Sequence, residues 1–312
     1  MHIYIIKRVL FLIPTVLGVT LIIFAIMNIT PGDPGRAILG HSARQHEVDA
    51  FNEELGFNRP FLQRYVSYVI NAAQGDFGTS YFTKQSVFRE VWPRYLVTIR
   101  LALTGVLLAA LIGVPLGVIA AVRQYSLWDT LPSLICFFLA AIPGFVLGLV
   151  LLYVFSLRLN LLPSFGLGTF QHYIMPTIAI AIPPAAMNMR FTKSSMLEAI
   201  RQDYVRTARA KGASESIVIW KHTLKNALLP VVTQIGLSLG LLIAGAVVIE
   251  RLFSLPGIGS LIVDRISFKD EPVIIAGTIL ISICFTVVML LVDCLYAFID
   301  PRIRAKYSKM DG

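Results

Sequence analysis

The sequence has few charged residues and few cysteines, and each shortage excludes a class of protein. Only 14% of the 312 residues are charged, whereas soluble domains carry about 25%. With 56% hydrophobic residues and a mean hydropathy of +0.74, a soluble fold could not hide the apolar surface. Cys136, Cys284 and Cys294 lie in apolar runs without Cys-x-x-Cys or Cys/His spacing, so neither a disulfide framework nor a metal site is predicted.

Motifs for catalysis and for nucleotide binding are also absent. The chain has no Gly-x4-Gly-Lys-Ser/Thr phosphate loop, no His-Glu-x2-His and no Gly-x-Ser-x-Gly. We therefore expect no catalytic residue and no cofactor on this chain, and an ATP-driven process would need an ATPase on another chain. The formal charge of +9 fits basic loops on one side of a membrane, and we expect no nucleic-acid partner.

Six long apolar runs are present instead, each close to the length of a helix that crosses a bilayer. Such a helix needs about 20 residues, and a lone strand would leave its backbone polar groups unpaired in lipid. We predict an all-α integral membrane protein with about six transmembrane helices. The runs are Val9–Gly32, Leu101–Val122, Thr130–Leu157, His172–Met189, Asn226–Ile249 and Pro272–Val292, the last continuing to Ile299.

These runs divide the chain into predicted parts. The parts are a head and first helix (1–30), an external segment (31–97), a five-helix membrane domain (98–299) with a cytoplasmic loop (190–228), and a tail (300–312). In the external segment we expect helices at Glu47–Leu55 and Pro60–Ala73 and a turn at Gly75–Gly78, and further on a loop at Leu162–Gly168.

The distribution of Lys and Arg predicts the orientation. The side of the N-terminus carries 15 basic residues, and the opposite side carries 4 when Thr30–Arg100 is set aside, because long loops say little about orientation. Both termini are therefore expected in the cytoplasm.

The most informative stretch is the basic loop between the fourth and fifth runs. It predicts two short helices broken at Gly212, the second capped by Ser214. Its basic side chains, Lys193 among them, are expected to face the cytosol; on charge alone the loop could also simply touch anionic lipid. The residues expected to dock on the bundle, at helical spacing, are Ile217, Trp220, Leu224 and Leu228.

The full pattern of this loop resembles the coupling segment of ABC importer permeases, which sits in a groove of the ATPase. The stretch Asp203 to Gly212 is similar to the dipeptide/oligopeptide/nickel branch of that family. It departs from the general pattern at Arg206-Thr207-Ala208, where Glu-Ala-Ala is common, and at Pro230, which lies further downstream. The residues that the resemblance places against the ATPase, without saying which makes the main polar contact, are Asp203, Tyr204, Arg206, Thr207, Ala208, Arg209, Lys211 and Gly212.

Other stretches resemble the first of the two permeases in these systems, in the same order along the chain. They are the head Lys7–Pro34 with Pro31-Gly32-Asp33-Pro34, Leu55–Pro60 with Gly75–Tyr81, Glu250–Gly259 with Asp270–Val273, and Asp300–Arg304. The resemblance implies the type I ABC importer permease fold and a place in a bacterial inner membrane.

The resemblance also implies partners. These are a second homologous permease, two ABC ATPase subunits that hold ATP and Mg, and an external solute-binding protein. The chain would form half of the pore of an importer for small peptides, and permeases for glutathione and for nickel or metal chelates share the pattern. ATP binding would move the segment around Gly212 and alternate the access of the pore.

Three features could belong to the transport pathway. Pro176, Pro183 and Pro184 interrupt the hydrogen-bond ladder of the fourth run, as a pore liner or as a packing kink. Phe253, Pro256, Gly257 and Gly259 predict a tight external turn near the pore mouth. Asp293 is the only acid well inside a run; it could pair with a loop or tail Arg, or serve a proton-coupled transporter together with Glu250. That alternative predicts more helices and an inverted repeat, and the sequence shows neither.

Overall fold

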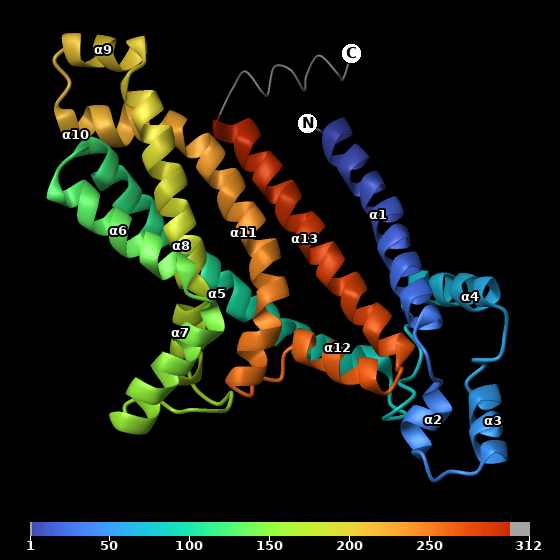
Figure 1. The fold of residues 1–312 in the computed structure, drawn as a ribbon. Coiled ribbons are helices and arrows are strands. Elements are labelled where there is room, and N and C mark those ends of the chain that lie inside the picture. Colours follow the sequence, from blue (N-terminus) through green and yellow to red (C-terminus); the bar gives the residue numbers. More distant parts are fainter. Residues whose placement is uncertain (1, 300–312) are drawn as a thin grey trace. The chain divides into compact units, whose positions relative to one another are not determined.

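The computed structural model describes residues 2–299, and helices joined by loops make up this part of the chain (Figure 1). Within it, the only β-type pairing is an isolated bridge between Thr79 and Ser86, so the prediction of an all-α fold is confirmed. The predicted tail 300–312, with its Asp300–Arg304 motif, lies outside the described residues.

The chain contains long or apolar helices and short elements that connect them. The long or apolar elements are α1 (His2–Ile29), α5 (Val87–Val122), α6 (Leu127–Ala141), α7 (Gly144–Leu151) with the π-helix η1 (Leu152–Arg158), α8 (Gln171–Ile200), α11 (Leu224–Leu252) and α13 (Glu271–Ile299). The short connecting elements are α2 (Pro34–Leu39), α3 (Gln45–Glu54), α4 (Phe61–Ala73), α9 (Asp203–Ala210), α10 (Glu215–Ile217), the π-helix η2 (Val218–Thr223) and α12 (Ile258–Ser267).

Four continuous helical stretches of the described chain are long and apolar enough to cross a membrane, and a bent helix pair can supply a fifth. The four are Leu10–Ile29, Val87–Val122, Glu215–Ile243 and Glu271–Leu295. The fourth predicted run falls within α8, which is long enough but is not among the stretches that meet the hydropathy criterion. Much of the surroundings of α8 is supplied by three other helices, α6, α7 and α11.

The third predicted run is not one straight helix. Its two halves, α6 and α7–η1, meet at an angle of 98°. Ile142 adopts an extended conformation (φ −86°, ψ 124°) and Pro143 precedes the first residue of α7. A residue before proline is pushed out of the helical region, because the proline ring clashes with its backbone. The prediction of a single helix over Thr130–Leu157 was therefore wrong at this point.

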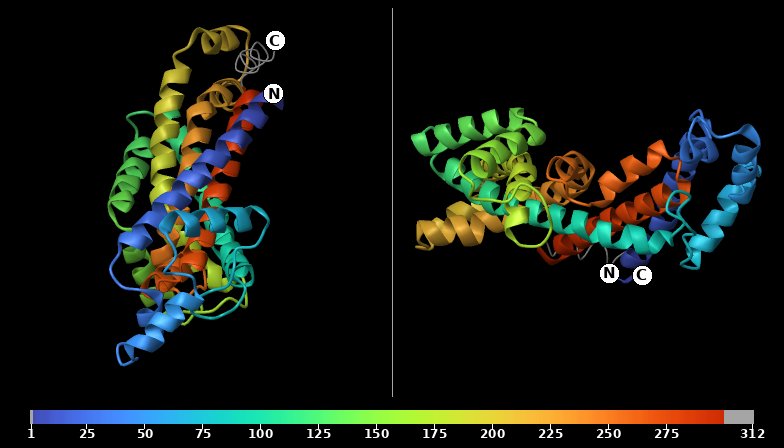
Figure 2. Two further views of the ribbon diagram at one scale, coloured as in Figure 1. Left: turned by 90° about the vertical axis from the view of Figure 1, so that its right-hand side faces the viewer. Right: turned by 90° about the horizontal axis from the view of Figure 1, so that it is seen from below.

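The chain forms two compact units. The first unit contains, among the described residues, 2–4, 99–255 and 287–299. In this unit α8 contacts α6, α7 and α11 (Figure 2). Thirteen residues of α8 are buried. Gly113 and Gly117 of α5 pack against α8 so closely that a Cβ on Gly117 would lie 2.5 Å from Cβ of Thr192. Glycines four residues apart let two membrane helices approach in this way.

The second unit combines Ile5–Thr98 with Pro256–Thr286. The start of α5, α12 and the start of α13 share one core, and Phe24 of α1 packs with Ile275 and Ile279 of α13 in another. The predicted helices at Glu47–Leu55 and Pro60–Ala73 are confirmed as α3 and α4. The turn at Gly75–Gly78 is confirmed as well, since both glycines have positive φ.

Candidate functional site

The candidate coupling segment is the polar connection from α8 to α11 in the first unit. Figure 1 shows α9 as a short helix at one end of α8. It begins at Asp203, and Gln202 occupies the N-cap position without a side-chain hydrogen bond. Val205 is the one residue of α9 that is buried, with 0% exposure. Tyr204, Arg206, Thr207 and Arg209 are exposed, so α9 buries a single side chain and presents its polar face to solvent.

The end of α9 is closed by a backbone motif that depends on glycine. The N–H of Gly212 donates to the carbonyl of Arg209 (2.9 Å), and that of Ala213 donates to the carbonyl of Ala208 (3.3 Å). This pair of bonds is a Schellman motif, which needs a left-handed residue after the helix cap. Lys211 is the cap, and Gly212 supplies the left-handed residue with φ +81°. The predicted break at Gly212 is therefore confirmed.

An ion pair spans this break. Arg209 Nε donates to Glu215 Oε1 at 2.7 Å, and Arg209 Nη2 donates to Oε2 at 3.3 Å. These bonds raise the pKa of the Arg209 guanidinium above its usual value. Bidentate pairing constrains direction as well as distance. Both side chains are largely exposed (41% and 63%), so the pair supports the path from α9 into α10 that the backbone motif sets, with a modest contribution of its own. Ser214 occupies the predicted N-cap position but forms no cap hydrogen bond with its side chain.

The prediction that Ile217, Trp220, Leu224 and Leu228 dock on the bundle is confirmed only in part. Leu224 packs against the core around Met196 and Ala227, but Ile217 and Trp220 are 47% and 51% exposed. The buried residues are Val218, Thr223 and Ala227. The cause is η2, in which the Thr223 hydroxyl bonds to the carbonyl of Val218, five residues earlier (2.9 Å). A π-turn inserts an extra residue and shifts the register that a 3.6-residue period predicts.

Lys193 also differs from the prediction that the basic residues of the loop face solvent. It lies in α8, which extends to Ile200, and its amine forms a salt bridge with the buried carboxylate of Asp129. Asp129 also accepts from the backbone N–H of Tyr125 at 3.1 Å and from the Ser133 hydroxyl at 3.2 Å. This cluster ties the start of α6 to α8. The sequence did not reveal this contact of Lys193, because Lys193 lies next to the basic residues of the loop that follows.

The predicted pathway prolines lie in an uninterrupted α8. Pro176 is buried, whereas Pro183 and Pro184 line a cavity of about 400 Å³. Two polar side chains of α11, Gln234 and Ser238, line the same cavity. Pro183 and Pro184 therefore border a space between α8 and α11 that residues of α6 and α7 also line; their role as pore liners stays a prediction.

The predicted external turn has a different form. The residue with positive φ is Ser254 (φ 51°), and Gly257 is extended and caps α12. Gly259 lies inside α12, a helix that the sequence did not predict. Phe253 ends α11 and is buried, with 1% exposure. Pro256 belongs to the second unit, just before α12. Asp293 lies part-buried in α13, and the tail arginines predicted as its partners lie outside the described residues.

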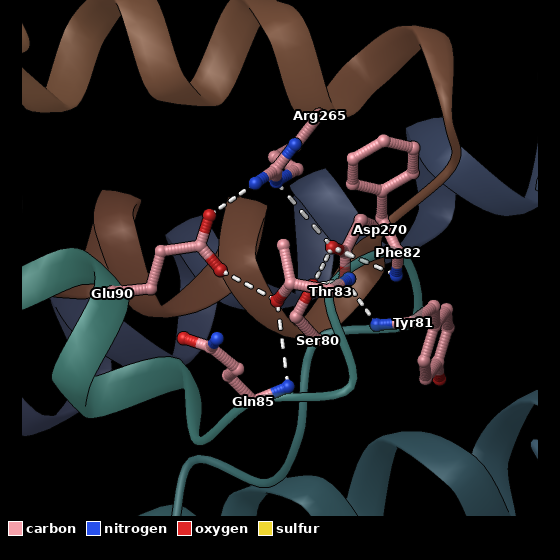
Figure 3. Close-up of polar contacts among 8 residues, drawn as sticks. All are labelled: Ser80, Tyr81, Phe82, Thr83, Gln85, Glu90, Arg265 and Asp270. Atoms are coloured by element: carbon pink, nitrogen blue, oxygen red, sulfur yellow. Dashed lines mark hydrogen bonds and ion pairs between the residues drawn. The ribbon is translucent and has the colours of Figure 1, made fainter.

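A buried cluster of charges in the second unit was missed by the sequence analysis (Figure 3). Arg265 of α12 pairs with Glu90 of α5, and its Nε lies 3.6 Å from Asp270 Oδ2. Asp270 also accepts from the Ser80 hydroxyl and from the backbone N–H of Tyr81 (2.9 Å). We call Glu90, Arg265, Asp270 and Ser80 the Arg265 cluster.

The Arg265 cluster joins segments that are 175 and 190 residues apart in the chain. Burial raises the pKa of the Asp270 carboxyl above its usual value. The hydrogen bonds from Ser80 and the backbone and the charge of Arg265 act in the opposite direction but do not outweigh burial. Two stretches noted for their family pattern, Gly75–Tyr81 and Asp270–Val273, therefore meet through Asp270.

We expect Arg265→Leu to destabilise the protein by about 3–5 kcal/mol, because it leaves the buried carboxylates of Glu90 and Asp270 without a cation. Thermal unfolding of the detergent-solubilised protein measures this loss. The control is Lys84→Ala, which removes an exposed ion pair with Glu54 (3.7 Å) and a cation–π contact with Phe51 (4.3 Å) and should change stability by about 1 kcal/mol. Equal melting temperatures for the two variants would contradict a structural role for the cluster.

The chain is similar in sequence to known membrane transport proteins. Residues 113–305 match the family model described as "Binding-protein-dependent transport system inner membrane component", and residues 1–102 match that of its N-terminal part. The glutathione transport system permease protein GsiC of Escherichia coli K12 is 41% identical over 303 residues, covering 97% of this chain and 99% of the relative. GsiC of Shigella dysenteriae gives the same values.

A solved structure shares the fold. A chain from inward-facing structures of the MetNI methionine ABC transporter aligns with a TM-score of 0.55 and 19% identity, covering 68% of this chain and 95% of that chain. At this identity the likeness concerns the fold alone.

Proposed function

The chain belongs to the family of binding-protein-dependent transport system inner membrane components, in its dipeptide/oligopeptide branch, and we propose that it forms half of the pore of an ATP-driven importer of small peptides. It is a multi-pass inner-membrane permease of the ABC importer type. Membership in a transport family favours ATP-driven uptake over the proton-coupled alternative. ATP and Mg would be held by other chains, because this sequence lacks a phosphate loop.

The observation that carries the proposal is the geometry of α9. A short helix with one buried side chain and an otherwise exposed polar face is suited to fit a groove of a partner. The ion pair between Arg209 and Glu215 and the motif at Gly212 hold this helix at a fixed angle to α10. We propose that α9 docks on an ATPase subunit and transmits its movement to α8 and α11.

The complete importer would contain a second permease, two ATPase subunits and an external binding protein. The basic residues support an orientation with both termini in the cytoplasm, because 15 lie on the side of the N-terminus and 4 on the opposite side apart from Thr30–Arg100. In this orientation α9 would lie in the cytoplasm, where the ATPase subunits would dock. The cavity between α8 and α11, bordered by Pro183 and Gln234, is our candidate for part of the pathway.

Glutathione is the first substrate to test, because the 41% identical relatives are glutathione permeases. We expect membranes that contain the chain with its partner subunits and binding protein to take up labelled dipeptides or glutathione only with ATP. Uptake of a nickel chelate is the control for the alternative in the same branch. Uptake of the chelate alone would contradict a peptide substrate, and uptake without ATP would contradict the ABC mechanism.

A further inference from the structure

A polar cavity lies within the second unit, away from the Arg265 cluster's central arginine. Its volume is about 290 Å³, and α4, the turn after it and the start of α13 contribute to its wall. This is near the lower end of the range for small-molecule sites and is about ten times the liquid volume of one water molecule. Tyr68, Phe77 and Tyr81 supply aromatic walls, and Glu271 supplies a carboxylate.

Only one of the two carboxylate oxygens of Glu271 has a partner in the described part of the chain. Its side chain is 2% exposed, and Oε2 forms a salt bridge with Arg64 Nη2. The other oxygen, Oε1, is buried and has no hydrogen-bond partner in the described part of the chain. Buried polar atoms are nearly always hydrogen-bonded, and an unpaired carboxylate oxygen is among the least favourable exceptions. Glu271 therefore lines the cavity while one of its carboxylate oxygens lacks a donor.

Neither of the two neighbouring cations donates to this oxygen. Arg64 donates Nη1 to the carbonyl of Phe57 (3.2 Å), and its guanidinium lies over the ring of Phe57 at 4.4 Å. Lys269 has three donors, and it uses them on the carbonyls of Met27, Thr30 and Gly32, where α1 ends. Lys269 is thus committed to other groups, and Arg64 already pairs with the other oxygen of Glu271.

The lining suits a ligand with hydrogen-bond donors. Three acids, Glu54, Asp76 and Glu271, line the cavity with Arg59 and Arg64. Glu54 also pairs with Lys84, and Asp76 accepts from the backbone N–H of Gly78. Aromatic faces attract organic ammonium groups, and the wall carries several. A metal ion fits less well, since no group of three or more His, Cys, Asp or Glu side chains suited to one exists among the described residues.

We propose that this cavity binds the primary ammonium group of a small ligand, through Glu271 Oε1 and the surrounding aromatic rings. A short peptide with a free amino terminus has such a group, so the identification of the ligand with a transported peptide rests on the proposed function. The binding site itself does not depend on transport. The cavity would then contact a peptide through its amino end at a position separate from the α8–α11 cavity.

The test uses the full-length permease in lipid nanodiscs and two probes, alaninamide and N-acetylalaninamide. The probes differ in the positive charge of the amino group. Calorimetry at neutral pH should show saturable binding of alaninamide and binding of the acetylated probe that is weaker by about tenfold or more, as expected when a charged hydrogen bond is lost. Equal affinity for both probes, or no saturable binding of alaninamide, would overturn the proposal.

Two variants and a control separate binding from folding. Glu271→Gln should weaken alaninamide binding by about tenfold, and Ser67→Phe should block the cavity while leaving the pair of Glu271 with Arg64 intact. Glu90→Gln also removes a buried carboxylate that pairs with an arginine but does not line the cavity, and it should bind like the unmodified protein. Unchanged affinity in Ser67→Phe and Glu271→Gln refutes the site. Loss of uptake with intact alaninamide binding would count against the proposed function alone.

Discussion

Replacing Gly212 with proline is expected to lower uptake by at least about tenfold, within the range of typical coupling free energies, while the protein still inserts into the membrane. Proline fixes φ near −65° and has no N–H. The native φ is +81°, and the N–H of Gly212 bonds to the carbonyl of Arg209 at 2.9 Å. The variant therefore loses the motif that ends α9 and sets its angle. ATP-dependent uptake and co-purification of the ATPase measure the effect.

Gly75→Pro is the matched control for this experiment. Gly75 ends α4 with the same motif: its N–H bonds to Ala72, that of Asp76 bonds to Asn71, and its φ is +86°. A Cβ at either glycine would have no atom within 4 Å, so the local strain is comparable. Normal ATPase co-purification with Gly75→Pro and its loss with Gly212→Pro would support coupling through α9. Normal uptake by Gly212→Pro would refute it.

The second large effect is expected where α5 meets α8. Gly117→Val should destabilise the permease by about 3 kcal/mol or more, at the upper end of overpacking effects. The reason is that a Cβ at Gly117 would lie 2.6 Å from the carbonyl oxygen of Met189 and 2.5 Å from Cβ of Thr192. Backbone cannot rotate away as a flexible side chain can, so α8 would have to shift. The melting temperature and the monodisperse yield in detergent measure this loss.

Gly18→Val is the control, because Gly18 lies in α1 and a Cβ there would have nothing within 4 Å. It should leave the melting temperature nearly unchanged. Gly113→Val should resemble Gly117→Val, since its Cβ would lie 2.7 Å from Cβ of Asn188. If the variants at Gly113 and Gly117 melted like Gly18→Val, the close approach of the two helices would not exist in the membrane.

Local signals in the sequence predicted much of the fold. The membrane class followed from the length of the apolar runs, and α3 and α4 followed from helical spacing between turn residues. The break at Gly212 was predictable because a glycine after a basic helix end is itself the cause of the left-handed turn. In each case the determining residues lie within a few positions of the element.

Other features depend on residues that are distant or on small changes of register. The 98° bend could have been inferred from Pro143. However, α8 is continuous through Pro176, Pro183 and Pro184, so a proline in the sequence does not by itself predict where a helix breaks. The π-turn of η2 shifts the buried face of α11 without a distinctive composition. The Arg265 cluster joins residues up to 190 positions apart, and no local pattern marks which acid an arginine will meet.

The composition of α8 has a consequence for the synthesis of the protein. This helix does not meet the hydropathy criterion for a span, yet it contacts α6, α7 and α11 and buries thirteen residues. A segment of this kind partitions poorly into lipid alone, because Asn188 and Arg190 are unfavourable there. Because α11 follows α8 in the sequence, we expect α8 to be stably held in the membrane only once α11 has packed against it.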